Sequence, residues 1–217
     1  MKIKGFTLAE VLIVLTILGV IAALTMPALN ANIQKQQAGP ALMKAISTLE
    51  TANALVAQER DFYNFAESCH NYLNDCFEPF VKEKLGAASF NERIEYENMG
   101  NLGMVHDTFS NGYTTKNGFV YYIPSMDLND SGNMSIFVDI NGNKRPNVIG
   151  KDLFYLTLIA ENEGSNLYAD GSDALRELLH TQHNVSWRNA CNERQVNDGR
   201  VCAGSIVDNG GRVIYPW

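Results

Sequence analysis

The feature that most constrains this chain is an apolar stretch at residues 6–29. The only polar residues within it are Thr7, Glu10, Thr16 and Thr25. As an α-helix it would be about 36 Å long, enough to cross a hydrocarbon core of about 30 Å. A secretory signal peptide would have a shorter apolar part and an A-x-A-like site, and no good site of that kind follows Leu24. We therefore expect residues 6–29 to be a membrane-spanning helix, with Lys2 and Lys4 on the cytoplasmic side.

Glu10 lies just inside this apolar stretch, where an ionised side chain is costly and by default marks a function and a partner. The segment GFTLAE at residues 5–10, followed by Val11-Leu12-Ile13-Val14-Leu15, resembles the prepilin processing signature of type IV pilins and type II secretion pseudopilins. In that signature a short basic leader ends in Gly, and Phe-Thr-Leu and a Glu follow at fixed spacing. A proline of the family falls on Pro27. Ala9 is a departure, because a larger apolar residue is more usual there.

The resemblance implies that the chain is a substrate of processing enzymes and has no enzymatic activity. A prepilin peptidase would cut between Gly5 and Phe6, removing a leader at 1–5, and the new amine of Phe6 would be N-methylated. Glu10 would set the register of assembly, and Pro27 would kink the helix. The implied partners are other pilin or pseudopilin subunits, the prepilin peptidase and methyltransferase, an inner-membrane assembly platform and the lipid bilayer. The implied location is the bacterial inner membrane, single-pass, with the head in the periplasm or outside the cell.

The helix is expected to continue through residues 30–67 as an amphipathic segment. Apolar residues recur there at steps of three and four, which is typical of one buried helical face: Leu42, Ile46, Leu49, Ala52 or Asn53, Val56 and Tyr63. Pro27 and Pro40 each remove a backbone donor and can bend the helix, although Pro40 could also begin a separate helix. Either reading predicts a long N-terminal helix with one face packed on a globular head.

Residues 68–217 are expected to form that head, a small antiparallel sheet laid against the helix, so the fold class is α+β. The pattern predicts helices at 77–85, ended by Gly86, and at 173–180. It predicts strands at 118–125 and 134–140, joined as a hairpin. Residues 152–161 are ambiguous between strand and helix. Residues 201–207 and 212–217 flank Asp208-Asn209-Gly210-Gly211, which predicts a second hairpin.

Four cysteines allow three disulfide connectivities. An oxidising compartment outside the cytoplasm favours disulfides, and the local pairs Cys69–Cys76 and Cys191–Cys202 each close a short loop. The second pair also resembles the disulfide-bounded loop near the C-terminus of many type IV pilins. Zinc is the alternative, with His70 beside Cys69, although C-x2-C spacing is absent.

Calcium is the one cofactor that the sequence raises. Asp127-x-Asn129-x-Ser131-Gly132 resembles the start of an oxygen-ligand calcium loop, but its twelfth position is Val138 rather than Glu. A second run from Asp139 and Asn141 to Asp152 looks like a loop of pseudopilin-like heads, some of which bind calcium. Lys144 and Arg145 oppose a cation there, and turns in which Asn and Asp bond their own backbone are the simpler reading.

The formal net charge is −7, which argues against nucleic acid as the main partner. Catalytic motifs such as G-x-S-x-G and H-E-x-x-H are absent from the sequence. Two functions remain open: a pseudopilin or minor pilin of a secretion or pilus machine, and a binding pilin for adhesion or DNA uptake. A membrane-tethered monomer would not need Glu10 at its position.

Overall fold

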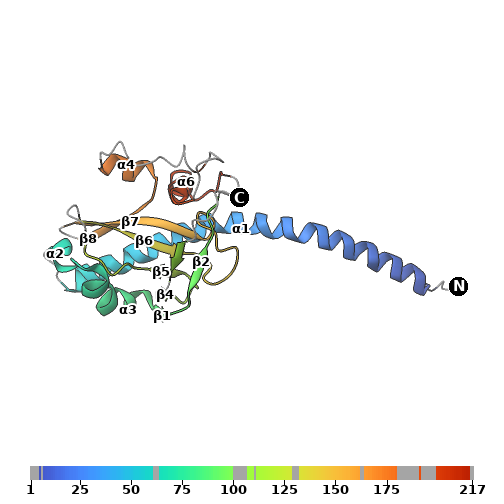
Figure 1. The fold of residues 1–217 in the computed structure, drawn as a ribbon, viewed down its shortest axis with the longest axis horizontal. Helices are drawn as coiled ribbons and strands as arrows, with labels where there is room; N and C mark the ends of the chain where they lie inside the picture. Colours follow the sequence, from blue (N-terminus) through green and yellow to red (C-terminus); the bar gives the residue numbers. More distant parts are fainter. Residues whose placement is uncertain are drawn as a thin grey trace.

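The long N-terminal helix predicted from the sequence is one continuous element in the computed structural model. The structure describes residues 5, 7–60, 64–99, 107–109, 111–128, 132–161, 164–179, 191 and 199–215. Helix α1 runs from Leu8 to Arg60 and contains both Pro27 and Pro40. Its first half projects from the head, and its second half lies along the sheet (Figure 1). The amphipathic face is confirmed, because Leu42, Leu49 and Val56 are all buried.

The head begins with three short helices that follow α1. They are α2 (Phe65–Ser68), η1 (Tyr72–Val81) and α3 (Lys82–Leu85). Helix η1 has the wider π spacing, in which the Lys82 N–H donates to the Phe77 carbonyl. Pro79 lies inside it and supplies no N–H, and such an irregularity suits a π-type turn. Gly86 ends α3 with a φ of 59°, so the predicted helix and its stop are confirmed, although the helix starts earlier than expected.

Six strands form one antiparallel sheet in the order β1-β4-β5-β6-β7-β8. Their bounds are β1 (Ala88–Phe90), β4 (Gly112–Thr114), β5 (Val120–Tyr122), β6 (Asn133–Asp139), β7 (Leu153–Glu161) and β8 (Gly164–Ala169). Strands β5 and β6 pair Val120 with Asp139 and Tyr122 with Phe137, so the first predicted hairpin is confirmed. A separate ribbon pairs β2 (Ile94–Tyr96) with β3 (Asp107–Phe109).

Strand β7 resolves the segment whose pattern did not separate strand from helix. It is a central strand, paired with both β6 and β8. Phe154, Leu156 and Leu158 face the core shared with α1, and Leu153 and Tyr155 face the cluster under the β2–β3 ribbon. A strand covered on both faces has no polar side, which explains why its sequence does not alternate.

The predicted C-terminal hairpin is wrong. Residues Cys202–Asp208 form helix α6, and Cys202 through Ile206 are all buried. Gly210 and Gly211 have φ values of 62° and 83°. Their N–H groups donate to the carbonyls of Val207 and Ile206, so the glycine pair ends a helix instead of turning between strands. Helix α4 (Asp173–Leu179) agrees with the short helix that was predicted before it.

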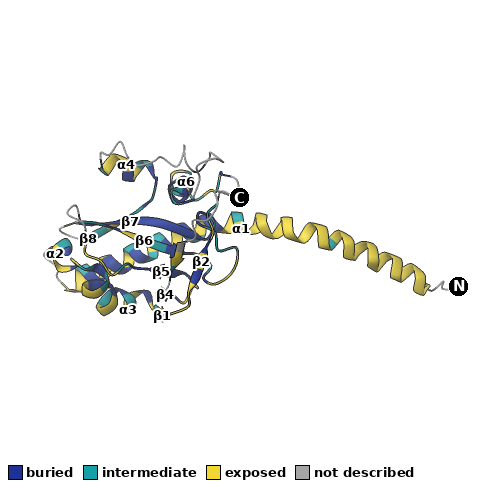
Figure 2. Cartoon of the chain, viewed as in Figure 1, coloured by how far each residue is buried: buried dark blue, intermediate teal, exposed yellow. Residues whose placement is uncertain are grey.

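The core lies between α1 and the sheet, and burial changes abruptly along α1. Residues from Ala38 onward contribute buried side chains, whereas the projecting half is almost entirely exposed (Figure 2). This arrangement, a long N-terminal helix packed on an antiparallel sheet, is the pilin-like α+β fold that the sequence predicted.

Candidate processing and assembly site

The end of α1 carries the residues expected to be cleaved and modified. Gly5 is exposed, while Phe6 lies outside the described residues. The Thr7 N–H donates to Glu10 Oε2 at 2.8 Å, and the Thr7 hydroxyl donates to the same oxygen at 2.9 Å. The Glu10 N–H donates back to the Thr7 hydroxyl oxygen at 3.3 Å. Thr7 and Glu10 therefore form a reciprocal capping box at the start of the helix.

Sequence reasoning overlooked this role of Glu10. The signal was present, because a Thr followed three residues later by Glu before an apolar run is the pattern of a capping box. Both bonds from Thr7 end on one carboxylate oxygen. The carboxylate is thus held at the helix start by its own chain, before any neighbouring subunit contributes a partner.

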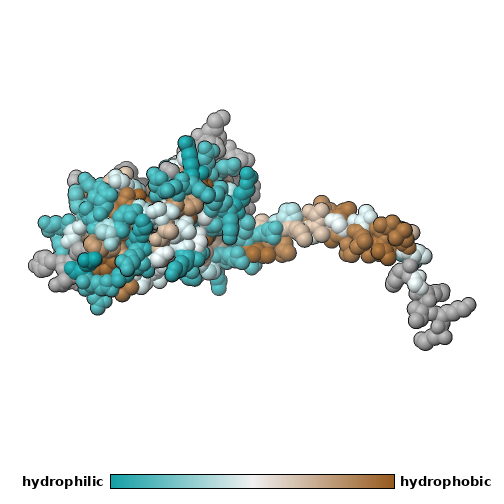
Figure 3. Space-filling model, turned by 90° about the horizontal axis from the view of Figure 1, so that it is seen from below, coloured by the Kyte–Doolittle hydropathy of each residue, from teal (hydrophilic) through white to brown (hydrophobic). Residues whose placement is uncertain are grey.

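The projecting half of α1 has the surface of a segment made for an apolar environment. It is the one helix among the described residues that is long and apolar enough to span a membrane, and its apolar window contains no buried residue. Its surface contrasts with that of the head (Figure 3). The hydroxyls of Thr16 and Thr25 donate to the Leu12 and Ile21 carbonyls at 2.8 and 2.9 Å. These polar groups are satisfied within the helix, as a lipid or protein interior requires. Pro27 lies within the unbroken helix, and its kink stays a prediction.

The second half of α1 is fixed to the head by polar contacts as well as by its apolar face. Tyr121 donates its hydroxyl to the Ala45 carbonyl at 2.8 Å. The buried Asn53 accepts from the Tyr72 hydroxyl at 2.6 Å and donates to the Ser165 hydroxyl at 3.0 Å. Because Asn53 is almost fully buried, these bonds offset its desolvation and fix the rotation of the helix on the sheet.

All four cysteines are paired in the structure. Cys69 is bonded to Cys76, linking the end of α2 to η1, and Cys191 is bonded to Cys202 at the start of α6. These are the local pairs that the sequence favoured. His70 lies 3.7 Å from an oxygen of Asp127, and no group of His, Cys, Asp and Glu suited to a metal occurs among the described residues.

The candidate calcium residues belong to two separate parts of the chain. Asp127 precedes β6, where Asn71 donates to it at 3.1 Å, whereas Asp139 is the last residue of that strand. The seven residues of β6 extend over roughly 20 Å. Asn129 lies outside the described residues. Asp127 with Asn129 and Asp139 with Asn141 are thus two separate candidates, and calcium binding at either stays a prediction.

The carboxylate of Asp139 is already used by the backbone. Its Oδ1 accepts from the Asn141 and Gly142 N–H groups at 2.8 Å each, and its Oδ2 accepts from the Tyr96 hydroxyl. Asp152 likewise accepts from the Asn147 and Val148 N–H groups. The two aspartates fasten the two ends of the loop at residues 140–151. Burial raises the pKa of Asp139 to about 7 and that of Asp152 to about 6.

Comparison with known proteins agrees with the N-terminal geometry. The family model described as the prokaryotic N-terminal methylation motif matches residues 1–26. That motif is the signature of type IV pilins and pseudopilins, which are structural subunits. Neither the curated proteins nor the solved structures include a significant match to this chain. The motif and the fold together point to a pilin-like, membrane-anchored subunit, with one candidate spanning helix in the described part of the chain.

Proposed function

We propose that this chain is a structural subunit of a type II secretion or type IV pilus filament, a pseudopilin or minor pilin. The observation that carries the proposal is a methylation motif at the tip of a helix that projects bare from a folded head. Prepilin peptidase removes residues 1–5, Phe6 becomes the methylated N-terminus, and an inner-membrane platform lifts the subunit from the bilayer into the filament. The head then lies in the periplasm or outside the cell.

Apolar burial supplies the free energy of assembly. Exposed side chains along the projecting helix, such as Leu8, Leu24 and Met26, have no partner within the chain's own head. They are covered by lipid first and by neighbouring helices later. Each Å² of apolar surface removed from water stabilises the assembled state by about 25 cal/mol. This term is non-directional and permits many axial registers.

Glu10 selects one register. Both Thr7 bonds end on Oε2 of Glu10, and Oε1 is the acceptor that we assign to the Phe6 amine of a neighbouring subunit. A carboxylate is costly in an apolar filament core unless it is paired. Only the axial offset between subunits that brings a neighbour's Phe6 amine to Glu10 is therefore stable.

N-terminal mass spectrometry of natively processed protein tests the processing step. The expected product begins at Phe6 and carries one methyl group. Recovery of intact Met1 from a host that has the peptidase contradicts this part of the proposal.

Three substitutions separate the two roles of Glu10. Glu10→Ala removes both the cap and the charge, Glu10→Gln keeps a capping side chain without the charge, and Glu10→Asp keeps the charge on a shorter arm. We expect all three to be cleaved after Gly5. We expect Ala and Gln to enter filaments poorly, and Asp to retain part of the function. Cleavage is measured by mass spectrometry, and incorporation by shearing and sedimentation from the same cells.

The Gln variant is the sharpest of the three. If Gln assembles normally while Ala does not, Glu10 acts as a helix cap and the register argument fails. If Ala also assembles normally in otherwise wild-type filaments, neither role matters for assembly. Both outcomes leave the cleavage result standing as a separate test of the pilin assignment.

A further inference from the structure

Charge is distributed unevenly over the head. The whole chain has 17 basic and 24 acidic residues. The three segments that meet where α1 leaves the head, residues 30–43, 140–151 and 209–215, contain basic residues and no Asp or Glu. We name their basic residues the collar: Lys35, Lys144, Arg145, Lys151 and Arg212.

The structure places these three segments around the helix. One groove is lined by Asn32 and Lys35 of α1 together with Arg212 and its neighbours. A second groove is lined by Gln34 and Gln37 of α1 together with Pro146, Lys151 and the acidic Asp152. Lys35 also donates to the Tyr215 carbonyl at 3.1 Å, which ties the C-terminal segment to the helix. Lys35, Lys151 and Arg212 of the collar thus lie beside the turns at which α1 enters the head.

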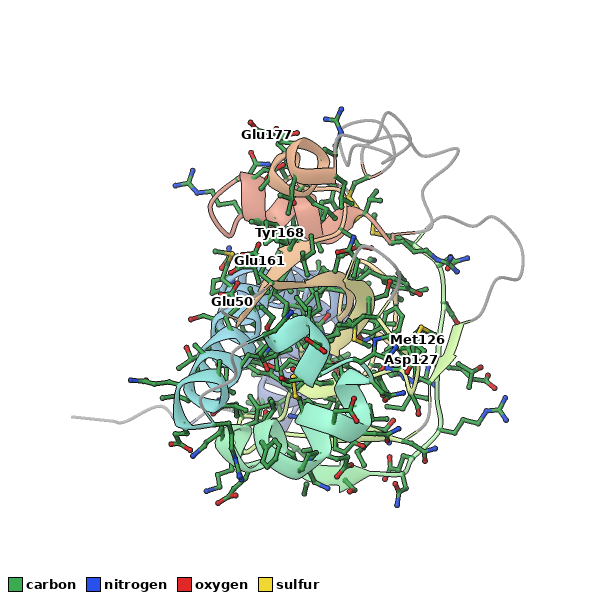
Figure 4. The ribbon with its side chains drawn as sticks, turned by 90° about the vertical axis from the view of Figure 1, so that its left-hand side faces the viewer. Glu50, Met126, Asp127, Glu161, Tyr168 and Glu177 are labelled. Carbon is green, nitrogen blue, oxygen red and sulfur yellow. A yellow bond between two sulfur atoms is a disulfide. The ribbon has the colours of Figure 1, made fainter. Side chains whose placement is uncertain are left out.

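Acidic side chains lie at the opposite end of the head. Figure 4 views the molecule from the end remote from the projecting helix, and Glu50, Glu161 and Glu177 lie along one side of it, with Asp127 on the other. Next to the collar, the groove that Arg145 lines also contains Arg93, Glu95 and Glu97. The groove that Lys35 and Arg212 line beside α1 contains no Asp or Glu among its described residues, whereas the groove of Lys151 also contains Asp152.

The depth of the collar matches the headgroup layer of a bilayer. Lys35 is six residues beyond Leu29, where the apolar stretch ends, so it lies about 9 Å further along the helix. The headgroup region extends roughly 5–8 Å beyond the hydrocarbon on each side. Long basic side chains reach back along the helix to that layer. Ile33 and Ile214, which are 41% and 50% exposed, lie among them as apolar side chains suited to the same interface.

We propose that the collar binds the phosphates of anionic phospholipids in the outer leaflet of the membrane that α1 spans. It would hold the head against the bilayer before assembly and fix the depth of the helix. This proposal rests on membrane insertion of α1 and not on filament formation. Each basic residue near an anionic surface strengthens binding about fivefold at low salt, and salt weakens the effect.

The test uses the full chain in nanodiscs of phosphatidylcholine mixed with phosphatidylglycerol. Native mass spectrometry counts the lipids that stay bound to the released protein. We expect the wild type to retain phosphatidylglycerol preferentially. The triple variant Lys144→Gln, Arg145→Gln, Arg212→Gln should lower that preference by on the order of 100-fold at low salt. Lys35 and Lys151 are left intact because both contact buried parts of the head.

A matched control removes the same charge elsewhere on the head. Lys82 and Lys84 lie on α3 and Arg176 lies on α4, and each makes a partly exposed ion pair with a nearby carboxylate. The control replaces each of the three with Gln. This control should retain phosphatidylglycerol as the wild type does. Hydrogen exchange should also slow at residues 140–151 in the mixed nanodiscs relative to phosphatidylcholine alone, and only in chains with an intact collar.

Four results would overturn the proposal. The wild type and the collar variant could retain lipids equally, or the control variant could lose the preference as well. Inorganic phosphate could displace the lipid, which would identify a free-phosphate site. Finally, the collar variant could keep its lipids but fail to enter filaments in the sedimentation assay, which would assign the collar to the acidic surface of a neighbouring subunit.

Discussion

The junction between α1 and the C-terminal segment offers a test of how the head is held to its helix. Gly39 lies on α1 where the helix passes the backbone of Gly211. A Cβ added at residue 39 would lie 1.9 Å from the Gly211 carbonyl oxygen and 2.7 Å from its carbon. The C-terminal segment would have to retreat by at least about 1 Å to reach even the shortest contact that real Cβ atoms make. Gly39→Ala should therefore force the two segments apart.

The magnitude follows from what that retreat would disturb. The segment holds Tyr215, which is 1% exposed and donates its hydroxyl to the Gly150 carbonyl. Overpacking costs about 1–3 kcal/mol, and loss of part of the Tyr215 burial costs about 2 kcal/mol more. Alanine gains about 1 kcal/mol over glycine in a helix. The net loss is about 2–4 kcal/mol, which lowers the melting temperature by on the order of 10 °C in a chain of this size.

The same substitution elsewhere on α1 provides the control. A Cβ at Gly19 meets nothing within 4 Å, so Gly19→Ala should leave the head's melting temperature unchanged. Thermal unfolding of the detergent-solubilised full chain, followed by near-ultraviolet circular dichroism, measures both variants. If Gly39→Ala melts at or above the wild-type temperature, the close approach of α1 to Gly211 is not a constraint and the reasoning is refuted.

Three further predictions concern the head. Burial raises the pKa of Asp139 from 3.8 to about 7, so the folded state binds this proton more tightly than the unfolded state. The free energy of unfolding should therefore fall as pH rises from about 4 to 7. Asp139→Asn should flatten this slope in pH-dependent denaturation, and an unchanged slope would assign it to other groups. Non-reducing peptide mapping of exported protein should recover Cys69–Cys76 and Cys191–Cys202, and four free thiols would refute the pairing. The melting temperature should be the same with calcium as with a chelator, because backbone N–H groups already bond the carboxylates of Asp139 and Asp152. A rise of several degrees with calcium would show that the native state binds the ion.

The long helix and the sheet were predictable because their patterns are local. An apolar run followed by a stripe at Leu42, Leu49 and Val56 specifies both halves of α1 from periodicity alone. Strand β7 was not assignable in the same way, because its type depends on what covers it. Tyr155 packs under the β2–β3 ribbon and Leu156 packs toward α1, and neither neighbour is close in sequence.

The C-terminal error has a similar origin. Asn209-Gly210 is a good turn signal, but a left-handed glycine serves a helix end as well as a hairpin. Gly204 favours the helix over the hairpin. A Cβ added at residue 204 would lie 2.3 Å from the Ser172 nitrogen. Only a glycine lets α6 approach the backbone before α4 so closely. That approach buries Cys202 through Ile206 in the core, and it is a tertiary contact that no local pattern contains.

The point along α1 at which side chains become buried, near Ala38, links these observations. The apolar stretch that ends at Leu29 needs lipid or other helices on all sides, and from Ala38 onward one face of the helix packs on the head. The loop fastened by Asp139 and Asp152 and the segment ending in Tyr215 both contact α1 at this boundary. Neither contains any part of the processing motif. Substitutions at the boundary should therefore alter how the head sits relative to the helix while leaving cleavage and methylation intact. On the proposed function, substitutions at Gly5 or Glu10 should alter processing or register without changing the head. On the proposed function, the two ends of the projecting segment are independent sites: the processing enzymes and neighbouring helices contact one, and the membrane surface contacts the other.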